Sequence, residues 1–399
     1  MIRFVSKKKP SEHTKKLTTK ALGALSAKKA LGFHQLPFRD DIWSRSEKFA
    51  KELAARGDNL VVLGMGGSAL GGRCLTSTLG NRQRVHFLYN TDPSSFEAIL
   101  GNRKHLRESQ FLLVSKSGNT LELDCMVDVL QSRLKQGGRD LKSAVSVITE
   151  PKDSPLRSWA LQNKVLIEDH PLDVGGRFSV LTQVGLVPAS FSGVNLEELR
   201  RGAQSAITEP KLAIDIAAFY FESFKRKEQI SVFWLYADLL NDFGPWLTQL
   251  WAESLGKKTK GPSASTPMIL SGTCDQHSAL QQLMGDELKR SVCFVRSLEH
   301  EKMGPPLTGD GLAGFSYLKQ KNLGQVFSTQ ALSTEEALRK TGRTTSFIEL
   351  ERVDAFSLGQ LLVSFELVIG VLGEILKINA FDQPGVELGK KITKKRLES

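Results

Sequence analysis

Short apolar runs recur along the first part of the chain and predict the strands of a buried sheet. These runs are rich in β-branched residues. Amphipathic stretches with helical spacing lie beside them at residues 42–56, 120–134 and 155–162. Because strands and helices alternate, we expect a mostly parallel sheet covered on both faces. The expected strands are residues 60–63, 85–89, 111–115, 145–149 and 165–167.

A second series of alternating runs follows residue 195 and predicts another α/β unit. It ends in a long apolar helix at residues 356–378, which is followed by a turn. The other expected helices are residues 196–207, 212–227 and 239–255, and the expected strands are 230–236, 268–270, 292–295 and 346–350.

The fold class that follows is α/β, with two three-layer αβα domains, mostly parallel sheets and a helical C-terminal tail. The first residues are expected to form an extended or partly helical basic arm. The expected division is a basic N-terminal arm at 1–40, a first domain at 41–192, a second domain at 193–378 and a C-terminal tail at 379–399.

The length of the chain indicates how many domains it can form, and its charge distribution bears on whether it binds nucleic acid. The chain has 399 residues, enough for two ordinary domains, and a formal net charge of +11. The excess of lysine and arginine lies in the first 30 and last 10 residues, so the body is close to neutral. This distribution argues against a nucleic-acid-binding surface, and we expect no nucleic-acid partner.

Cysteine spacing and hydropathy indicate a cytoplasmic protein. The four cysteines are far apart and form no Cys-x-x-Cys pair, which suits a reducing compartment and predicts no zinc site. We expect no membrane helix, because we judge the apolar runs to be shorter than the roughly 18 residues that such a helix needs. The N-terminus has no apolar core of a signal peptide. We therefore expect no membrane association.

A glycine turn joins the first strand to the next helix. Residues 64–68 are Gly-Met-Gly-Gly-Ser, directly after the strand at 60–63. Such a turn lets an anion approach backbone N–H groups at a helix N-terminus, where phosphate binds well. A dinucleotide site fits poorly, because the Gly-x-Gly-x-x-Gly spacing is missing and no acidic residue ends the strand at 85–89. An ordinary turn of an α/β domain is the other interpretation.

A second polar loop follows the strand at residues 111–114. Residues 115–120 are Ser-Lys-Ser-Gly-Asn-Thr. Alone, this segment is typical of a helix N-cap and turn. Together with the glycine turn in the same sheet, its hydroxyl and N–H groups favour a phosphate site at the carboxyl ends of the strands.

Four further residues stand in patterns that suit catalysis. Arg177 follows a glycine pair, Glu253 lies one turn from a helix end, His277 lies in a strand-to-helix turn and Lys390 lies in the basic tail. Each alone has a structural explanation, such as an ion pair, an exposed helix acid or a solvated lysine.

Taken together, these segments resemble the glucose-6-phosphate isomerase family of the sugar isomerase (SIS) superfamily. The resemblance runs from about residue 60 to 396, in the family's order. The matching segments are Gly-Met-Gly-Gly-Ser at 64–68, Gly-Gly-Arg-Phe-Ser at 175–179, Ala-Glu-Ser-Leu-Gly-Lys at 252–257, Gly-Thr-x-x-Gln-His at 272–277 and Phe-Asp-Gln-Pro-Gly-Val-Glu-Leu-Gly-Lys at 381–390.

The resemblance implies an aldose–ketose isomerase of glycolysis and gluconeogenesis that needs no metal or organic cofactor. It implies that Glu253 is the base that moves a proton through a cis-enediol. Arg177 stabilises the enediolate, and His277 and Lys390 open the sugar ring.

The resemblance also implies the substrate-binding residues and a homodimer in which His277 completes the neighbouring site. The small-molecule partner is a sugar phosphate. The implied phosphate ligands are Ser68, Ser115, Ser117 and Thr120, and the other implied substrate ligands are Gly67, Lys116, Gln249 and Gln383.

Some positions depart from the family pattern. The second loop of the family is Ser-Lys-Thr-Phe-Thr-Thr, whereas the Ser-Gly-Asn-Thr sequence here is closer to other SIS domains. Leu255 replaces an asparagine and Pro384 a tryptophan. A bifunctional isomerase that also accepts mannose 6-phosphate is therefore an alternative. A non-catalytic SIS regulator is a more distant one, since a regulator has no reason to keep Glu253, His277 and Lys390 together.

Overall fold

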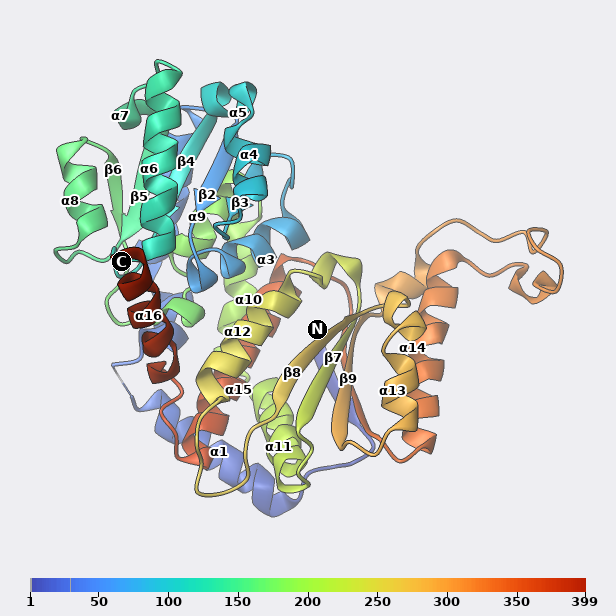
Figure 1. Ribbon diagram of the computed structural model, residues 1–399. Helices are drawn as coiled ribbons and strands as arrows, with labels where there is room; N and C mark the ends of the chain where they lie inside the picture. The colour runs from blue at the N-terminus through green and yellow to red at the C-terminus, as the bar shows by residue number, and fades with distance from the viewer. Residues whose placement is uncertain (1, 29) are drawn as a thin grey trace.

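The computed structural model describes residues 2–28 and 30–399 and contains two α/β units, one above the other in Figure 1. The α/β class expected from the sequence is confirmed. In the first unit all neighbouring strands are parallel. Their spatial order is β3 (Val85–Leu88), β2 (Asn59–Leu63), β4 (Ser109–Val114), β5 (Val145–Thr149) and β6 (Leu166–Asp169).

Alternate residues of the first sheet face two different helix layers. Val61 and Leu113 pack with one layer, whereas Val62 and Leu112 pack with the other. This is the period of two that a strand imposes on its side chains. Around the sheet lie α2 (Asp40–Ala54), α3 (Leu70–Leu79), α4 (Pro93–Leu100), α5 (Arg103–Glu108), α6 (Leu121–Gln136), α7 (Leu141–Ala144), α8 (Pro155–Gln162) and α9 (Gln183–Phe191).

The second unit is built around another five-stranded sheet. Four strands are parallel, and the first strand of the chain pairs antiparallel at one edge. The spatial order is β1 (Ile2–Ser6), β10 (Thr344–Leu350), β9 (Arg290–Ser297), β7 (Ile230–Tyr236) and β8 (Thr266–Ser271).

Helices cover both faces of the second sheet as well. Trp234 and Phe294 face α13 and α14, and Phe233 and Val295 face the layer that contains α15. Both units are therefore three-layer structures. The helices are α1 (Glu12–Ser26), α10 (Leu196–Thr208), α11 (Lys211–Lys225), α12 (Phe243–Leu255), α13 (Leu280–Gly285), α14 (Leu323–Lys340) and α15 (Ala355–Leu376).

The helix α15 is longer and more apolar than the sequence-based judgement of run lengths allowed. This helix has 22 residues and a mean hydropathy of 1.9 in its most apolar window, enough by length and composition to cross a bilayer. In the fold, 83% of that window is buried among other parts of the chain. The apolar surface of α15 is therefore that of a core helix.

The basic N-terminal segment is tied to the second unit. β1 pairs with β10 from Ile2 opposite Leu350 to Ser6 opposite Ser346. The ring of Phe4 lies 5.3 Å from that of Phe219 on α11, centroid to centroid. The sequence predicted an arm, and the structure shows an edge strand and a packed helix. The expected domain boundaries stay a prediction.

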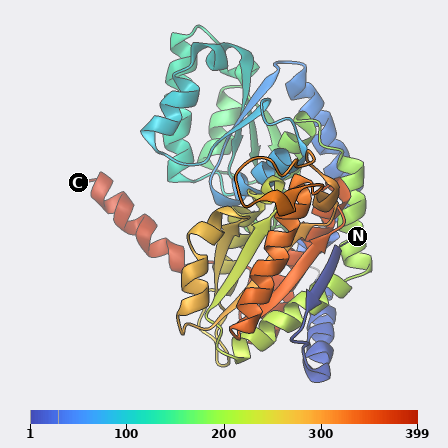
Figure 2. The same cartoon turned by 90° about the vertical axis from the view of Figure 1, so that its right-hand side faces the viewer.

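The C-terminal tail ends in α16 (Glu387–Leu397). All eleven residues of this helix are exposed. Figure 2 shows α16 projecting away from the body of the molecule. The helical tail expected from the sequence is present.

Candidate active site

The two predicted phosphate loops lie side by side at the carboxyl edge of the first sheet. β2 and β4 are neighbours, with Leu63 opposite Leu113. A Cβ added to Gly64 would lie 2.9 Å from the carbonyl oxygen of Val114, so the two strand ends are in close contact. This edge is where parallel sheets bind ligands.

The second loop is held in shape by its own hydroxyl groups. The Oγ of Ser115 lies 3.0 Å from the Oγ1 of Thr120, and it accepts a hydrogen bond of 3.1 Å from the backbone N–H of Gly118. Gly118 has a φ of +61°, a conformation that favours glycine. Ser117 is exposed, and the ammonium of Lys116 lies 3.6 Å from a carboxylate oxygen of Glu150.

Arg177 is the buried centre of the site. It belongs to the short 3-10 helix Gly176–Phe178, and its side chain is 4% exposed. Its Nε donates to the Oγ of Ser254 at 2.6 Å. One terminal nitrogen donates to the Oε1 of Gln383 at 3.1 Å, and the other to the carbonyl oxygens of Ala380 at 2.6 Å and Asp382 at 3.0 Å. The guanidinium therefore has a fixed orientation.

Glu253 lies beside this guanidinium near the end of α12. The distance from its Oε1 to the Nη1 of Arg177 is 3.4 Å. Its Oε2 accepts a hydrogen bond of 3.0 Å from the side-chain amide of Gln249. The two residues are one helical turn apart and so lie on the same face of α12. The carboxylate is oriented by two partners, and its side chain is 24% exposed.

The glycine turn of the first sheet contacts both halves of this cluster. A Cβ added to Gly67 would lie 2.2 Å from the carbonyl oxygen of Gly176, beside Arg177. A Cβ added to Gly66 would lie 2.8 Å from the amide nitrogen of Gln249. Only glycine allows the backbone to approach so closely. The phosphate loop, the arginine and the carboxylate are thus brought to one place.

Burial affects the charge of Arg177. Removal from water lowers the pKa of its guanidinium, whereas the nearby carboxylates of Glu253 and Asp382 raise it. Arginine stays protonated in proteins despite such shifts. The site therefore holds a desolvated cation, which can stabilise negative charge that develops on a substrate.

His277 and Lys390 lie apart from the cluster. His277 is exposed in the 3-10 turn Cys274–His277, between β8 and α13. Lys390 lies on α16, where its ammonium pairs with Glu387 at 3.0 Å. Across residues 2–28 and 30–399, no hydrogen bond or ion pair joins either side chain to Arg177 or Glu253.

Several groups that orient Arg177 could not be identified from the sequence. Ser254 and Lys257 stood inside the segment that carries Glu253, but nothing in the sequence shows what they contact. Two of the acceptors of Arg177 are backbone carbonyls, which have no sequence signal at all. The glycine pair before Arg177 was the one local indication of a close approach.

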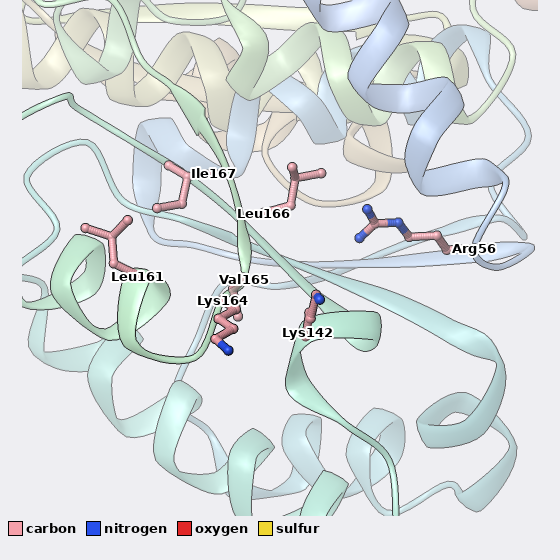
Figure 3. A pocket seen from close by; sticks show the side chains of 7 residues that line it. All are labelled: Arg56, Lys142, Leu161, Lys164, Val165, Leu166 and Ile167. Carbon is pink, nitrogen blue, oxygen red and sulfur yellow. The ribbon is translucent and has the colours of Figure 1, made fainter.

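The described part of the chain has no group of three or more His, Cys, Asp or Glu side chains arranged to hold a metal ion. An open recess of about 420 Å³ lies at the opposite, amino edge of the first sheet. Figure 3 shows the side chain of Leu166 between those of Leu161 and Arg56. None of the candidate site residues lines this recess.

Comparison with known proteins matches the chain to one family. The family described as phosphoglucose isomerase matches residues 45–292 and 318–399. A glucose-6-phosphate isomerase of Campylobacter jejuni is 36% identical over 352 residues, covering 86% of each chain. One from Rubrobacter xylanophilus is 33% identical over 388 residues, covering 92% of this chain and 89% of the relative.

Solved structures agree in fold. A protein of Thermus thermophilus, described as hypothetical, superposes with a TM-score of 0.89 at 30% identity over the whole of both chains. A glucose-6-phosphate isomerase of Chlamydia trachomatis has a TM-score of 0.84 at 21% identity, covering all of this chain and 88% of that one. The chain therefore belongs to the phosphoglucose isomerase family.

Proposed function

We propose that this chain interconverts glucose 6-phosphate and fructose 6-phosphate, a step of glycolysis and gluconeogenesis. The observation that carries the proposal is the contact of a phosphate-type glycine turn with the backbone at Arg177 and with Gln249, the residue that holds Glu253 beside Arg177. This arrangement can hold the phosphate end of a sugar while a base acts on its other end.

The phosphate is proposed to bind at the carboxyl edge of the first sheet. Hydroxyl groups from both loops and backbone N–H groups of the glycine turn are available there. Lys116 adds a positive charge. The proposed phosphate ligands are Ser68, Ser115, Ser117 and Thr120.

Glu253 is proposed as the base once the ring has opened. Its carboxylate takes the proton from C2 of the aldose, which leaves an enediolate, and the proton of the O2 hydroxyl moves to O1. The carboxyl group of Glu253, whose proton can exchange with solvent, then delivers a proton to C1 as the C2 carbonyl forms. Arg177 stabilises the negative charge on the enediolate oxygens. Gln249 and Gln383 hold Glu253 and Arg177, respectively, and line the same space.

His277 and Lys390 are proposed as the ring-opening groups. Because His277 is exposed and apart from Glu253, the proposal includes a homodimer in which His277 of one copy completes the site of the other. The basic side chain of Lys390 must also approach the site, since the helix α16 that carries it projects from the body of the molecule.

The loop at residues 115–120 supports a second substrate. Its Ser-Gly-Asn-Thr sequence departs from the family pattern, which favours an enzyme that also accepts mannose 6-phosphate. The cellular location proposed is the cytoplasm, because the chain has free cysteines, two of them exposed.

The test is an NADP-coupled isomerase assay on the purified protein with fructose 6-phosphate, followed by mannose 6-phosphate. Turnover of the first supports the proposal, and turnover of both supports the bifunctional enzyme. A folded protein that binds fructose 6-phosphate without turning it over would instead be a sugar-phosphate-binding regulator.

A further inference from the structure

The turn at residues 379–383 joins the core to the site. It follows α15, and its first residues are anchored by apolar contacts. Ala380 is 1% exposed, and the ring of Phe381 lies 5.2 Å from that of Phe178. The remaining residues, Asn379, Asp382 and Gln383, are exposed, so polar contacts must hold them.

Lys257 supplies three polar contacts to the turn, and the side-chain amide of Asn379 donates a further hydrogen bond of 2.8 Å to the carboxylate of Asp382. The ammonium of Lys257 lies 2.6 Å from a carboxylate oxygen of Asp382 and donates to the backbone carbonyl of the same residue at 2.8 Å. It also donates to the carbonyl of Asn379. The side chain of Lys257 is 16% exposed, so these bonds are only partly screened by water.

The carbonyl oxygen of Asp382 is shared between two cations. It accepts from Lys257 at 2.8 Å and from Arg177 at 3.0 Å. A carbonyl oxygen has two lone pairs and can accept both bonds. Any movement of this carbonyl therefore changes a contact of the guanidinium that faces Glu253.

We propose that Lys257 is a positioning residue for Arg177. It holds the turn at 379–383, so that the turn's carbonyl groups orient the guanidinium toward the place where negative charge develops. The inference rests on the proposed function and extends it to a residue that does not touch the substrate. Three residues of segment 249–257 then contribute to the site. Gln249 and Glu253 lie in it directly, and Lys257 acts on it through the turn at 379–383.

The negative charge of Asp382 also contributes to how Lys257 acts on Arg177. The hydrogen bond from Lys257 lowers the pKa of the Asp382 carboxyl, with a smaller contribution from Arg177. An ionised Asp382 in turn favours the protonated form of Arg177. Replacing Lys257 removes one cation and also loosens a carboxylate near the catalytic arginine.

The test compares Lys257→Met with Lys258→Met. Lys258 is the adjacent exposed lysine and has no hydrogen bond or ion pair within the described chain, so its variant controls for the loss of one charge. We expect Lys257→Met to lower kcat about tenfold or more, the scale on which misplaced catalytic groups act. KM for fructose 6-phosphate should change less than about threefold, because Lys257 does not touch the phosphate loops. Lys257→Arg should restore most of kcat.

Two inhibitors separate positioning from a general loss of folded protein. Arabinonic acid 5-phosphate carries a carboxylate where the enediolate charge forms, and arabinitol 5-phosphate has a neutral alcohol there. Lys257→Met should weaken inhibition by the acid about as much as it lowers kcat, and should leave inhibition by the alcohol unchanged. A smaller fraction of folded enzyme would alter neither inhibition constant.

Asp382→Asn provides a second variant in case Lys257→Met does not fold. It removes the ion pair with Lys257 and keeps the shared carbonyl. The decrease in kcat and the selective weakening of inhibition by the acid should therefore both appear, but be smaller. Equal weakening of both inhibitors, or an unchanged preference for the acid, would overturn the role of Lys257. Wild-type turnover decides the proposed function separately, because it does not depend on any variant.

Discussion

The site has two regions that differ in how completely the chain builds them. Around Arg177, four hydrogen bonds and an ion pair fix the guanidinium, and Glu253 has a partner on each oxygen. His277 and Lys390 are exposed and stand on peripheral elements. Under the proposed mechanism, the groups for proton transfer are preorganised within one chain, whereas the proposed ring-opening groups, His277 and Lys390, would need a second copy or a movement of α16 to reach them.

The largest expected effect is on the preorganised half. Glu253→Gln keeps the size of the side chain and removes the base, so kcat should fall about 1,000-fold, within the range for general base catalysis. Binding of fructose 6-phosphate, measured by calorimetry, should persist because the phosphate loops are intact. Nearly full turnover by this variant would exclude Glu253 as the base.

Arg177→Lys tests whether orientation matters beyond charge. A lysine cannot make the forked contacts of Arg177, and it can leave the carbonyl group of the buried Ala380 without a donor. We expect kcat to fall about 100-fold. Arg201→Lys, on an exposed position of α10, is the matched control and should be close to wild type. Equal activity of both variants would show that any cation suffices.

An experiment that mixes two variants tests whether His277 acts in the site of the neighbouring subunit. Glu253→Gln and His277→Ala should each be weakly active alone. If His277 acts in the neighbouring site, a mixed dimer regains one intact site, and co-expression of the two should restore about a quarter of wild-type activity. Activity that stays at the level of the separate variants would place His277 in its own chain's site or outside catalysis.

Glu366 shows burial without pairing, in contrast to Glu253. It is fully buried on α15, and neither carboxylate oxygen has a hydrogen-bond partner among residues 2–28 and 30–399. Burial raises the pKa of Glu366 well above its usual value. Its folded-state pKa exceeds its unfolded-state pKa, so ionisation favours unfolding as pH rises above the ordinary carboxyl range.

Glu366→Gln should therefore stabilise the fold at neutral pH, by roughly 1–3 kcal/mol, with little change in activity. The gain should be smaller near pH 4.5 and larger near pH 7.5, as measured by urea unfolding. A gain that does not depend on pH would mean that folding does not raise the pKa of Glu366.

Much of the fold was predictable because its strands are short apolar runs bounded by polar turns. The run at 60–63 became β2, and the long apolar stretch at 356–378 became α15. β1 was not predicted as part of a sheet, since five residues next to lysines carry little signal without their partner β10. The helix expected at 239–255 begins only at Phe243, after a separate turn at Asp238–Leu240.

The candidate site was predictable only as a set of side chains. Resemblance supplied Arg177, Glu253 and the loops, and the structure brings these together. Three of the four acceptors that orient Arg177 come from a turn some 200 positions later in the chain, and two of these are backbone atoms. No local pattern reports such contacts, because they depend on the packing of α12 and α15.

The central claim is that Glu253 transfers the proton between C1 and C2. The most direct measurement follows exchange of substrate hydrogen with solvent deuterium, by NMR, for wild type and Glu253→Gln. Wild type should introduce deuterium into glucose 6-phosphate at C2 and into fructose 6-phosphate at C1, and Glu253→Gln should introduce almost none while still binding substrate. Deuterium incorporation by Glu253→Gln at the wild-type rate would contradict the account.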